Sequence, residues 1–284
     1  MIVKDMPESI YHAHSALSST GARMLLPEFK GSPKKFEWAQ SHRRTSRAFD
    51  VGHAVHAKVL GVGSGIITYP DEHLTPSGNP STKAATVLWA EEQHAAGLTV
   101  VSPDDAGRVD AMAEAVLKHE TAGPLFEVAE FREVSAFAEI DGVPVRARFD
   151  ALSGETRNGV YAVDLKTTDD ATNQGFTRSV NKWGYVVQEA HYRDVYKASE
   201  GHGINDFSFV CVEKSGPFEV AVITLEPYWV AMGHAKAARA RQVFRECTET
   251  GIWPGYDPAR QTLTAPAYAV IEHEMEYEQG EIHV

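Results

Sequence analysis

Cysteine, long apolar runs and positive charge are all scarce in this sequence of 284 residues. The two cysteines, Cys211 and Cys247, are too few and too far apart for a disulfide framework or a four-thiolate metal cluster. No stretch approaches the roughly 20 apolar residues that span a bilayer, and residues 1–12 have no apolar signal-peptide core. We therefore expect a protein that does not act in a membrane and that works in a reducing, cytoplasmic setting.

Lysine and arginine number 27 against 39 aspartates and glutamates, which leaves a formal net charge of −12. A balance this acidic argues against a protein that coats nucleic acid along its length. It is compatible with an enzyme that confines positive charge to one channel, whose affinity for DNA would then be modest and sensitive to salt. The length and the hydrophobic content of 43% are ordinary for a globular protein.

The one clear basic segment lies between Lys30 and Arg47, where six basic residues stand against the single acid Glu37. Such a segment is either a solvated helix face or a track for DNA phosphates. The second interpretation makes candidate DNA contacts of Lys34, Lys35, Arg43 and Arg44.

Serine and threonine residues precede an apolar run, which predicts a helix that starts near Ser18 or Ser19. In the simpler interpretation these hydroxyls only cap the helix. In the functional one they form, together with Arg23, an anion site for a DNA phosphate at the helix N-terminus.

Residues 143–168 hold the strongest pattern of the chain. Polar and apolar residues alternate in 146–150 and again in 160–166, as in half-buried strands. Gly154 and the Asn158-Gly159 pair between them predict a β-hairpin.

Charged residues converge at one end of this hairpin. Side chains of a strand alternate faces, so Asp164 and Lys166 point the same way, and pairing of the strands would bring Asp150 close to Asp164. Two carboxylates at close range repel each other unless a cation lies between them, and a hard ion such as Mg²⁺ would relieve the repulsion. The alternative is an ordinary surface ion pair after a hairpin.

The rest of the chain predicts an alternation of helices and strands, with three irregular segments. Residues 61–82 are rich in Gly, Pro and Ser and are expected to form a mobile loop, and 169–182 a polar loop. Residues 269–284 carry five acids and no lysine or arginine, which predicts a surface strand or a partly disordered end. Helices are predicted over 49–60, 83–96, 102–119, 183–199 and 228–247, and strands over 127–141, 206–214 and 219–225. Asp141-Gly142 is expected to form a turn into the strand that holds Asp150.

Asp150 followed by Asp164-Leu165-Lys166 resembles the D…(D/E)xK signature of the PD-(D/E)xK metal-dependent nucleases. His56, four residues after Gly52, resembles the helical histidine of RecB-type exonucleases. Gln188 and Tyr192 resemble the Q-x-x-x-Y element that follows in that branch. The order and spacing of these motifs are more specific than any one of them.

Within this superfamily the chain is similar to the exodeoxyribonuclease VIII (RecE-type) group of phage and prophage exonucleases, and in plan to lambda exonuclease and the RecB nuclease domain. The resemblance extends from about Tyr11 to Tyr256. One departure is that Ser32 occupies the position of a cysteine found in iron–sulfur members of the wider family. No cysteine cluster follows it, so we expect no Fe–S cluster.

The resemblance implies a role for each matched residue. Lys166 would position or deprotonate the attacking water, and Gln188 and Tyr192 would orient a catalytic residue or a DNA phosphate. Glu133, on the strand before the hairpin, is a candidate outer ligand. The ion, Mg²⁺ or Mn²⁺, would be held by His56, Asp150, Asp164 and the carbonyl of Leu165.

The same resemblance implies an α/β fold, with a central mixed β-sheet flanked by helices. We expect a single nuclease domain with a helical, basic segment over 1–48, a catalytic core over 49–256 and an acidic tail over 257–284. The implied activity is 5′-to-3′ digestion of linear double-stranded DNA from its ends in the cytoplasm of a bacterial host. The implied partners are a RecT-type single-strand annealing protein and further copies of the chain, in a ring of three or four subunits.

Two alternatives stay open. The chain is either an endonuclease or single-strand nuclease with the same site, or a non-catalytic DNA-binding or assembly protein on the same fold. A closed circular duplex distinguishes the first from an exonuclease, because an exonuclease needs an end. The presence of Asp150, Asp164 and Lys166 together argues against the second.

Overall fold

The computed structural model describes residues 1–42 and 47–278. The chain forms two units, Met1–Pro254 and Gly255–Val284, and each is described by itself. The helices of the first unit are α1 (Glu8–Ala13), α2 (Ser19–Leu25), α3 (Pro33–Ser41), α4 (Arg47–Leu60), α5 (Ala84–Ala95), α6 (Pro103–Lys118), α7 (Ala122–Glu127), α8 (Asn173–Trp183), α9 (Tyr185–Glu200) and α10 (Pro227–Thr250), with short 3₁₀ turns η1 (Pro27–Phe29) and η2 (Asp71–His73). Its strands are β1 (Ile2–Val3), β2 (Gly65–Thr68), β3 (Leu98–Val101), β4 (Phe131–Ile140), β5 (Val143–Leu152), β6 (Tyr161–Thr168), β7 (Asp206–Glu213) and β8 (Val220–Ile223).

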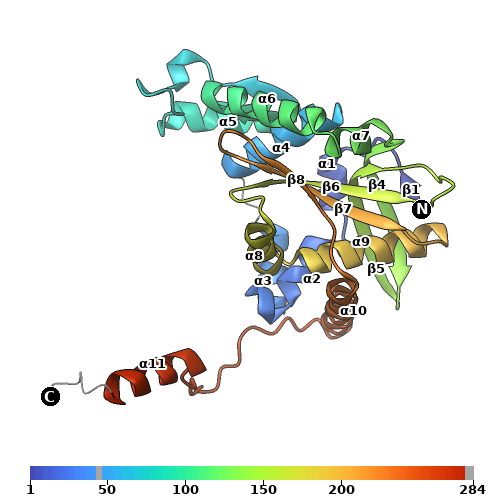
Figure 1. Cartoon of the computed structure of the whole chain (residues 1–284), viewed down its shortest axis with the longest axis vertical. Coiled ribbons are helices and arrows are strands. Elements are labelled where there is room, and N and C mark those ends of the chain that lie inside the picture. Colours follow the sequence, from blue (N-terminus) through green and yellow to red (C-terminus); the bar gives the residue numbers. More distant parts are fainter. Residues whose placement is uncertain (43–46, 279–284) are drawn as a thin grey trace. The chain divides into compact units, whose positions relative to one another are not determined.

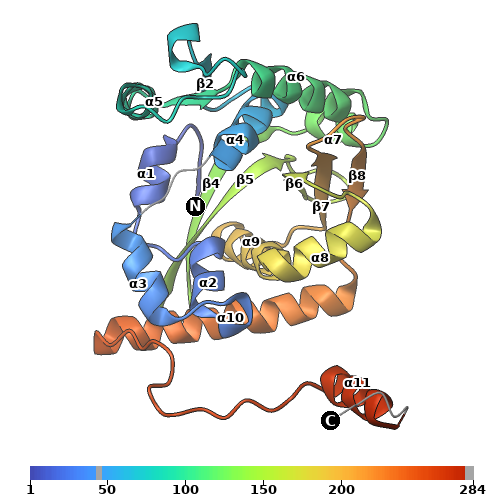
Figure 2. The ribbon, with the colours of Figure 1, turned by 90° about the vertical axis from the view of Figure 1, so that its left-hand side faces the viewer.

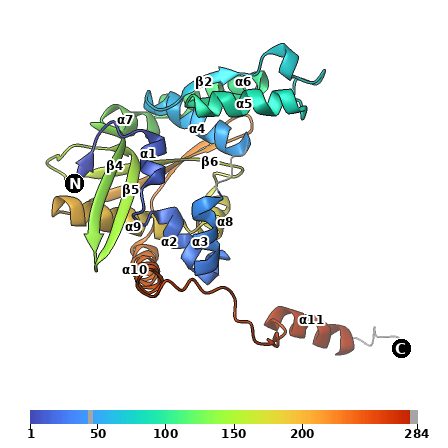
Figure 3. The same ribbon diagram turned by 180° about the vertical axis from the view of Figure 1, so that it is seen from behind.

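The longest strands, β4 and β5, form a hairpin that is plain in Figure 3. Asp141 and Gly142 connect them, and both have positive φ values, 53° and 75°. A two-residue turn with this geometry matches the right-handed twist of the strands it joins, and Asp-Gly is a favoured sequence for it. The predicted turn at this dipeptide is confirmed.

A six-stranded mixed sheet is the centre of the first unit, in the order β1-β4-β5-β6-β7-β8. Only β6 and β7 run parallel, and the connection between them consists of α8 and α9. The predicted β5–β6 hairpin forms, but it pairs at only two positions, Ala151 with Val163 and Leu152 with Ala162. Beyond these pairs the strands diverge, which leaves the Asp150 end of the hairpin open for side chains from a helix. The predicted mixed α/β fold is confirmed.

Helices cover both faces of this sheet (Figures 1 and 2). On one face α2, α9 and α10 pack on apolar side chains of the strands, among them Phe149 and Phe209. On the other face α4, α6 and α7 pack on Val163, Leu165 and Val210. Leu165 and its neighbour Asp164 are therefore both buried, on opposite faces of β6. This alternation brings the catalytic candidates of β6 to the α9 side.

Serine side chains begin several helices, as their sequence positions predict. Ser18 accepts a hydrogen bond from the amide of Gly21 at 3.2 Å, and Ser102 accepts one from Asp105 at 3.1 Å. Each satisfies an amide that a helix N-terminus would otherwise leave unpaired. The predicted helix starts near residues 18 and 102 are confirmed.

Two predicted loops contain regular structure. Residues 61–82 include β2, which pairs in parallel with β3, and η2. Residues 169–182 were expected to be irregular, but α8 begins at Asn173, with Thr172 as its cap. The pairing partner of β2 lies some thirty residues away, so the local sequence carries little signal for that strand. In α8, Phe176, Val180 and Trp183 recur at helical spacing, and the prediction of a loop missed this pattern.

The second unit contains one helix, α11 (Ala267–Glu278), among its described residues. The prediction of a strand or disordered end over 269–284 is therefore wrong for residues 269–278. Acidic and apolar residues alternate there as in a strand, but alanine, glutamate and methionine favour a helix. Over the whole described part of the chain, none of the helices combines the length and the apolar character that crossing a membrane requires.

Candidate active site

The site begins with one side chain from α4 and one from β5. Val55 and Val59 bury one face of α4 against the sheet, and His56 projects beside them. Its Nδ1 lies 3.5 Å from Oδ2 of Asp150. The two residues are 94 positions apart, and only the packing of α4 on the sheet brings them together.

Glu133 is the third residue of this group, and an unusual backbone conformation places it there. The β4–β5 register pairs Arg132 with Ala151 and Val134 with Phe149, so Glu133 lies opposite Asp150. Its φ is 51°, in the left-handed region that residues other than glycine rarely adopt. Strain of this kind persists where the surroundings hold it, and it is concentrated at functional sites.

His56, Glu133 and Asp150 offer ligand atoms that all lie within 4.8 Å of one another. Burial raises the pKa of Glu133, and the charge of Asp150 raises it further. Burial alone would lower the pKa of His56, but the Asp150 carboxylate outweighs it and raises that pKa to about 9. Two carboxylates and one imidazole that crowd each other in this way fit a divalent cation such as Mg²⁺ or Mn²⁺.

Asp164 and Lys166 form a second buried group next to the first. They make an ion pair on β6, and the amide of Leu165 between them donates to Oδ2 of Asp150 at 2.7 Å. Burial raises the pKa of Asp164 to about 6, although the ammonium of Lys166 acts in the opposite direction. The hairpin thus joins Asp150, Asp164 and Lys166 in one site, as the alternation of strand side chains predicts.

The second group packs against α9, through Gln188 and Tyr192. Gln188 donates from Nε2 to Oδ1 of Asp164 at 2.6 Å. Tyr192 is buried one turn further along, and its ring packs edge-on against Phe149. Burial raises the pKa of Tyr192 well above its usual value, and a hydrogen bond with Gln188 opposes that shift. Gln188 and Tyr192 are therefore placed to orient Asp164.

The remaining predicted residues lie at varying distances from this centre. Arg23 is close: its guanidinium bonds to the carbonyl of Trp183 and to Thr20, and its charge acts on Asp164. Ser18 is the cap of α2, and Ser19 is buried. Lys34 and Lys35 are exposed on α3. Arg43 and Arg44 lie outside the described residues.

Three residues at the site had little or no support from sequence reasoning. Glu133 was expected only as an outer ligand, and nothing in its local sequence indicates a left-handed conformation. Arg148 donates from Nε to Oε2 of Glu133 at 2.6 Å. Tyr185 places its ring 4.8 Å from Nζ of Lys166. For Arg148 the sequence does contain a signal. It lies two residues before Asp150 on a strand, so the two side chains are expected on the same face.

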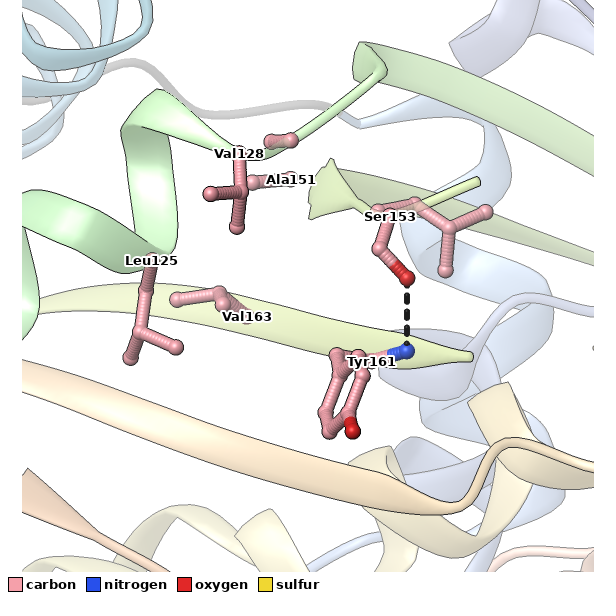
Figure 4. A pocket seen from close by; sticks show the side chains of 8 residues that line it. Leu125, Val128, Ala151, Ser153, Tyr161 and Val163 are labelled. Carbon is pink, nitrogen blue, oxygen red and sulfur yellow. Dashed lines mark hydrogen bonds between the residues drawn. The ribbon is translucent and has the colours of Figure 1, made fainter. Parts of the chain in front are cut away.

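A small hollow of about 180 Å³ lies elsewhere, between α7 and the β5–β6 hairpin (Figure 4). Its lining is mainly apolar, with Leu125, Val128 and Val163 prominent. The hydroxyl of Ser153, its one small polar side chain, accepts a hydrogen bond from the amide of Tyr161 at 2.9 Å. The hollow offers no titratable group for chemistry except the Tyr161 phenol, so we place the active site at the carboxylates.

The fold is shared with a solved structure. A crystal structure from Eubacterium rectale described as "Putative exonuclease" is similar over 93% of this chain and 95% of its own, with a TM-score of 0.61 and 12% sequence identity. The structure of SSO0001 matches 72% of this chain and 85% of its own at 14% identity, but its TM-score of 0.29 is too low to support any conclusion.

No curated protein matches this chain in sequence. A family model does match it over residues 26–261, a span that includes all the carboxylates described above together with Lys166, Gln188 and Tyr192. The PD-(D/E)xK resemblance of the motifs is thereby confirmed at the level of the superfamily. The chain belongs to the family described as "PDDEXK-like domain of unknown function (DUF3799)".

Proposed function

We propose that this chain is a Mg²⁺-dependent exonuclease that digests linear double-stranded DNA in the 5′-to-3′ direction. The observation that carries this proposal is the convergence of His56, Glu133 and Asp150 within 4.8 Å, next to the Asp164–Lys166 pair. A phosphodiester hydrolase of this superfamily needs such a set of ligands beside a lysine. Nuclease chemistry is also in keeping with membership of the PDDEXK-like family.

Each residue of the site has its own role in the proposed hydrolysis. A divalent cation held by His56, Glu133 and Asp150 would supply Lewis-acid stabilisation of the phosphoryl oxygens and activate water. Asp164 holds Lys166 as an ammonium, and this ammonium positions the attacking water. Gln188 fixes the Asp164 carboxylate from α9. The ligand set expected from the sequence also includes Asp164 and the carbonyl of Leu165, which would complete the coordination of the ion.

Arg23 extends the proposal toward the substrate. Its guanidinium lies beside the catalytic pair, and its Nε is buried without a hydrogen-bond partner. The positive charge of the guanidinium would attract a DNA phosphate that approaches the site. The exposed ammonium groups of the basic segment, including Lys34, are proposed to follow the DNA backbone further out.

The direct test uses linear duplexes labelled at the 5′ or the 3′ end, incubated with Mg²⁺, with Mn²⁺ or with EDTA. We expect loss of label from the 5′ end first, dependence on the metal, and no cleavage of a closed circular duplex. Asp150→Asn should abolish hydrolysis. Asp110→Asn is the matched control, because Asp110 is an exposed acid of α6 that pairs with Lys58 away from the site.

Each alternative has its own outcome in this experiment. Cleavage of the closed circular duplex would show that the chain is an endonuclease. Faster cleavage of single-stranded DNA than of duplex DNA would show that it is a single-strand nuclease. DNA binding without hydrolysis in the presence of any metal ion tested would show that the chain is a non-catalytic DNA-binding protein.

We further propose a ring of three or four subunits and a RecT-type annealing partner. Light scattering of the purified chain tests the ring, and co-purification with a RecT-type protein tests the proposed partner.

A further inference from the structure

The apolar stripe of α8 runs past the end of the core. Phe176, Val180 and Trp183 lie at i, i+4 and i+7, on one side of the helix. The first two are buried, but Trp183 is 51% exposed. A tryptophan that continues a buried stripe and yet stays half in solvent is a large apolar surface available to a ligand.

The backbone around Trp183 is fixed next to the catalytic lysine. The Arg23 guanidinium bonds to the Trp183 carbonyl. Gly184 follows with a φ of 65°, and a Cβ at that position would lie 2.9 Å from Cδ of Arg23, so a larger residue would be strained there. The next residue is Tyr185, whose ring lies 4.8 Å from Nζ of Lys166. Trp183 is thus two residues from a ring that touches the site.

A cation accompanies the exposed ring. Nζ of Lys182 lies 4.7 Å from the centre of the Trp183 ring. An aromatic face combined with a flexible ammonium matches the two parts of a nucleotide, since bases stack on aromatic rings and phosphates attract cations. Stacking of this kind does not depend on the identity of the base, which suits an enzyme that degrades DNA of any sequence.

We propose that Trp183, with Lys182, forms a stacking subsite for a nucleobase adjacent to the scissile phosphate. The proposal deepens the proposed function and rests on DNA being the substrate. It assigns the binding of a base to the α8–α9 junction, while the carboxylates and Lys166 act on the phosphate. The junction would thereby hold the terminal nucleotides of the strand that is being cut.

The test is a comparison of variants on DNA that lacks single bases. Binding is measured by fluorescence anisotropy in the Asp150→Asn background, so that the DNA is not consumed, with a labelled duplex in which a tetrahydrofuran abasic residue is moved through the terminal nucleotides of each strand. Trp183→Ala should weaken binding of the natural duplex about 5- to 100-fold. Trp183→Phe, which keeps an aromatic face, should retain most of the affinity.

At one abasic position the affinity of the Trp183→Ala variant should equal that of its parent, because the base that stacks on Trp183 is missing from that duplex. Tyr228→Ala is the matched control, since Tyr228 is an aromatic residue of α10 that is 74% exposed. Equal affinity of Trp183→Ala and its parent, or a difference that persists at every abasic position, would overturn the proposal. Hydrolysis by the unmodified chain with Mg²⁺ is assayed in parallel, so a failure of the nuclease assignment is seen separately.

Discussion

Nε2 of Gln188 donates to Oδ1 of Asp164 at 2.6 Å, and both side chains are buried. Asp164 is held on its other oxygen by Lys166, so the carboxylate has both oxygens engaged inside the protein. The hydrogen bond joins α9 to β6 and sets the direction in which the Asp164–Lys166 pair faces the group of His56, Glu133 and Asp150. It is therefore a link between the helical layer and the chemistry on the sheet.

Gln188→Ala should lower kcat about 10- to 100-fold with little change in KM, because a misdirected carboxylate weakens catalysis more than binding. Steady-state hydrolysis of a linear duplex measures both constants. Gln242→Ala on α10 is the control, since Gln242 is exposed and bonds within its own helix, to Glu246. Equal activity of Gln188→Ala and the unmodified chain would remove the orienting role.

His56 should make the metal-free protein sensitive to alkali. Its folded pKa of about 9 exceeds its ordinary value of 6.5, because the Asp150 charge outweighs burial. The folded state therefore binds the proton more tightly, and the resulting stabilisation is complete below pH 6.5 and lost as the pH rises through 9. Urea unfolding in EDTA should show a loss of roughly 1–3 kcal/mol between pH 6.5 and 9.5. His56→Gln should flatten that part of the profile, and an unchanged slope would contradict the assignment.

Glu133→Gln should separate metal binding from fold stability. The pKa of Glu133 is raised by burial and by Asp150, so the folded state prefers the neutral form and its charge opposes folding at pH 7.5. In EDTA the variant should be more stable than the unmodified chain. With Mn²⁺ the order should reverse, because a neutral amide is a weaker ligand. Melting temperatures with and without Mn²⁺ test both parts. If Mn²⁺ raises the melting temperature of the variant as much as that of the unmodified chain, Glu133 is not a ligand.

Two helical glycines should respond to alanine in opposite ways. At Gly233 of α10 a Cβ would lie 2.2 Å from the backbone carbonyl of Val186 on α9, so the two helices would have to move apart. Gly233→Ala should cost about 1–3 kcal/mol of unfolding free energy. Gly107 of α6 has open space around the same position, and Gly107→Ala should add about 0.5–1 kcal/mol. Urea unfolding of both variants measures the contrast, and a tolerant Gly233 would show that the α9–α10 contact is looser than described.

Local chemistry alone determined much of this protein. Alternating apolar residues predicted β4 to β8, Asp141-Gly142 predicted the turn between the longest strands, and Ser18 and Ser102 predicted helix starts. The spacing of Asp164 and Lys166 predicted that they share one face of a strand, because side chains of a strand alternate. Each of these features depends on residues a few positions apart, which is the range over which sequence patterns are informative.

Only the tertiary structure decided how the site is completed. Glu133 joins His56 and Asp150 because the β4–β5 register sets it opposite Asp150 in a left-handed conformation that no local pattern indicates. The pairing of β2 with β3 and the packing of the narrow apolar stripe of α8 likewise depend on residues distant in the chain. The physical reason is the same in each case: burial against a remote partner supplies the free energy, and a partner's position is a property of the fold.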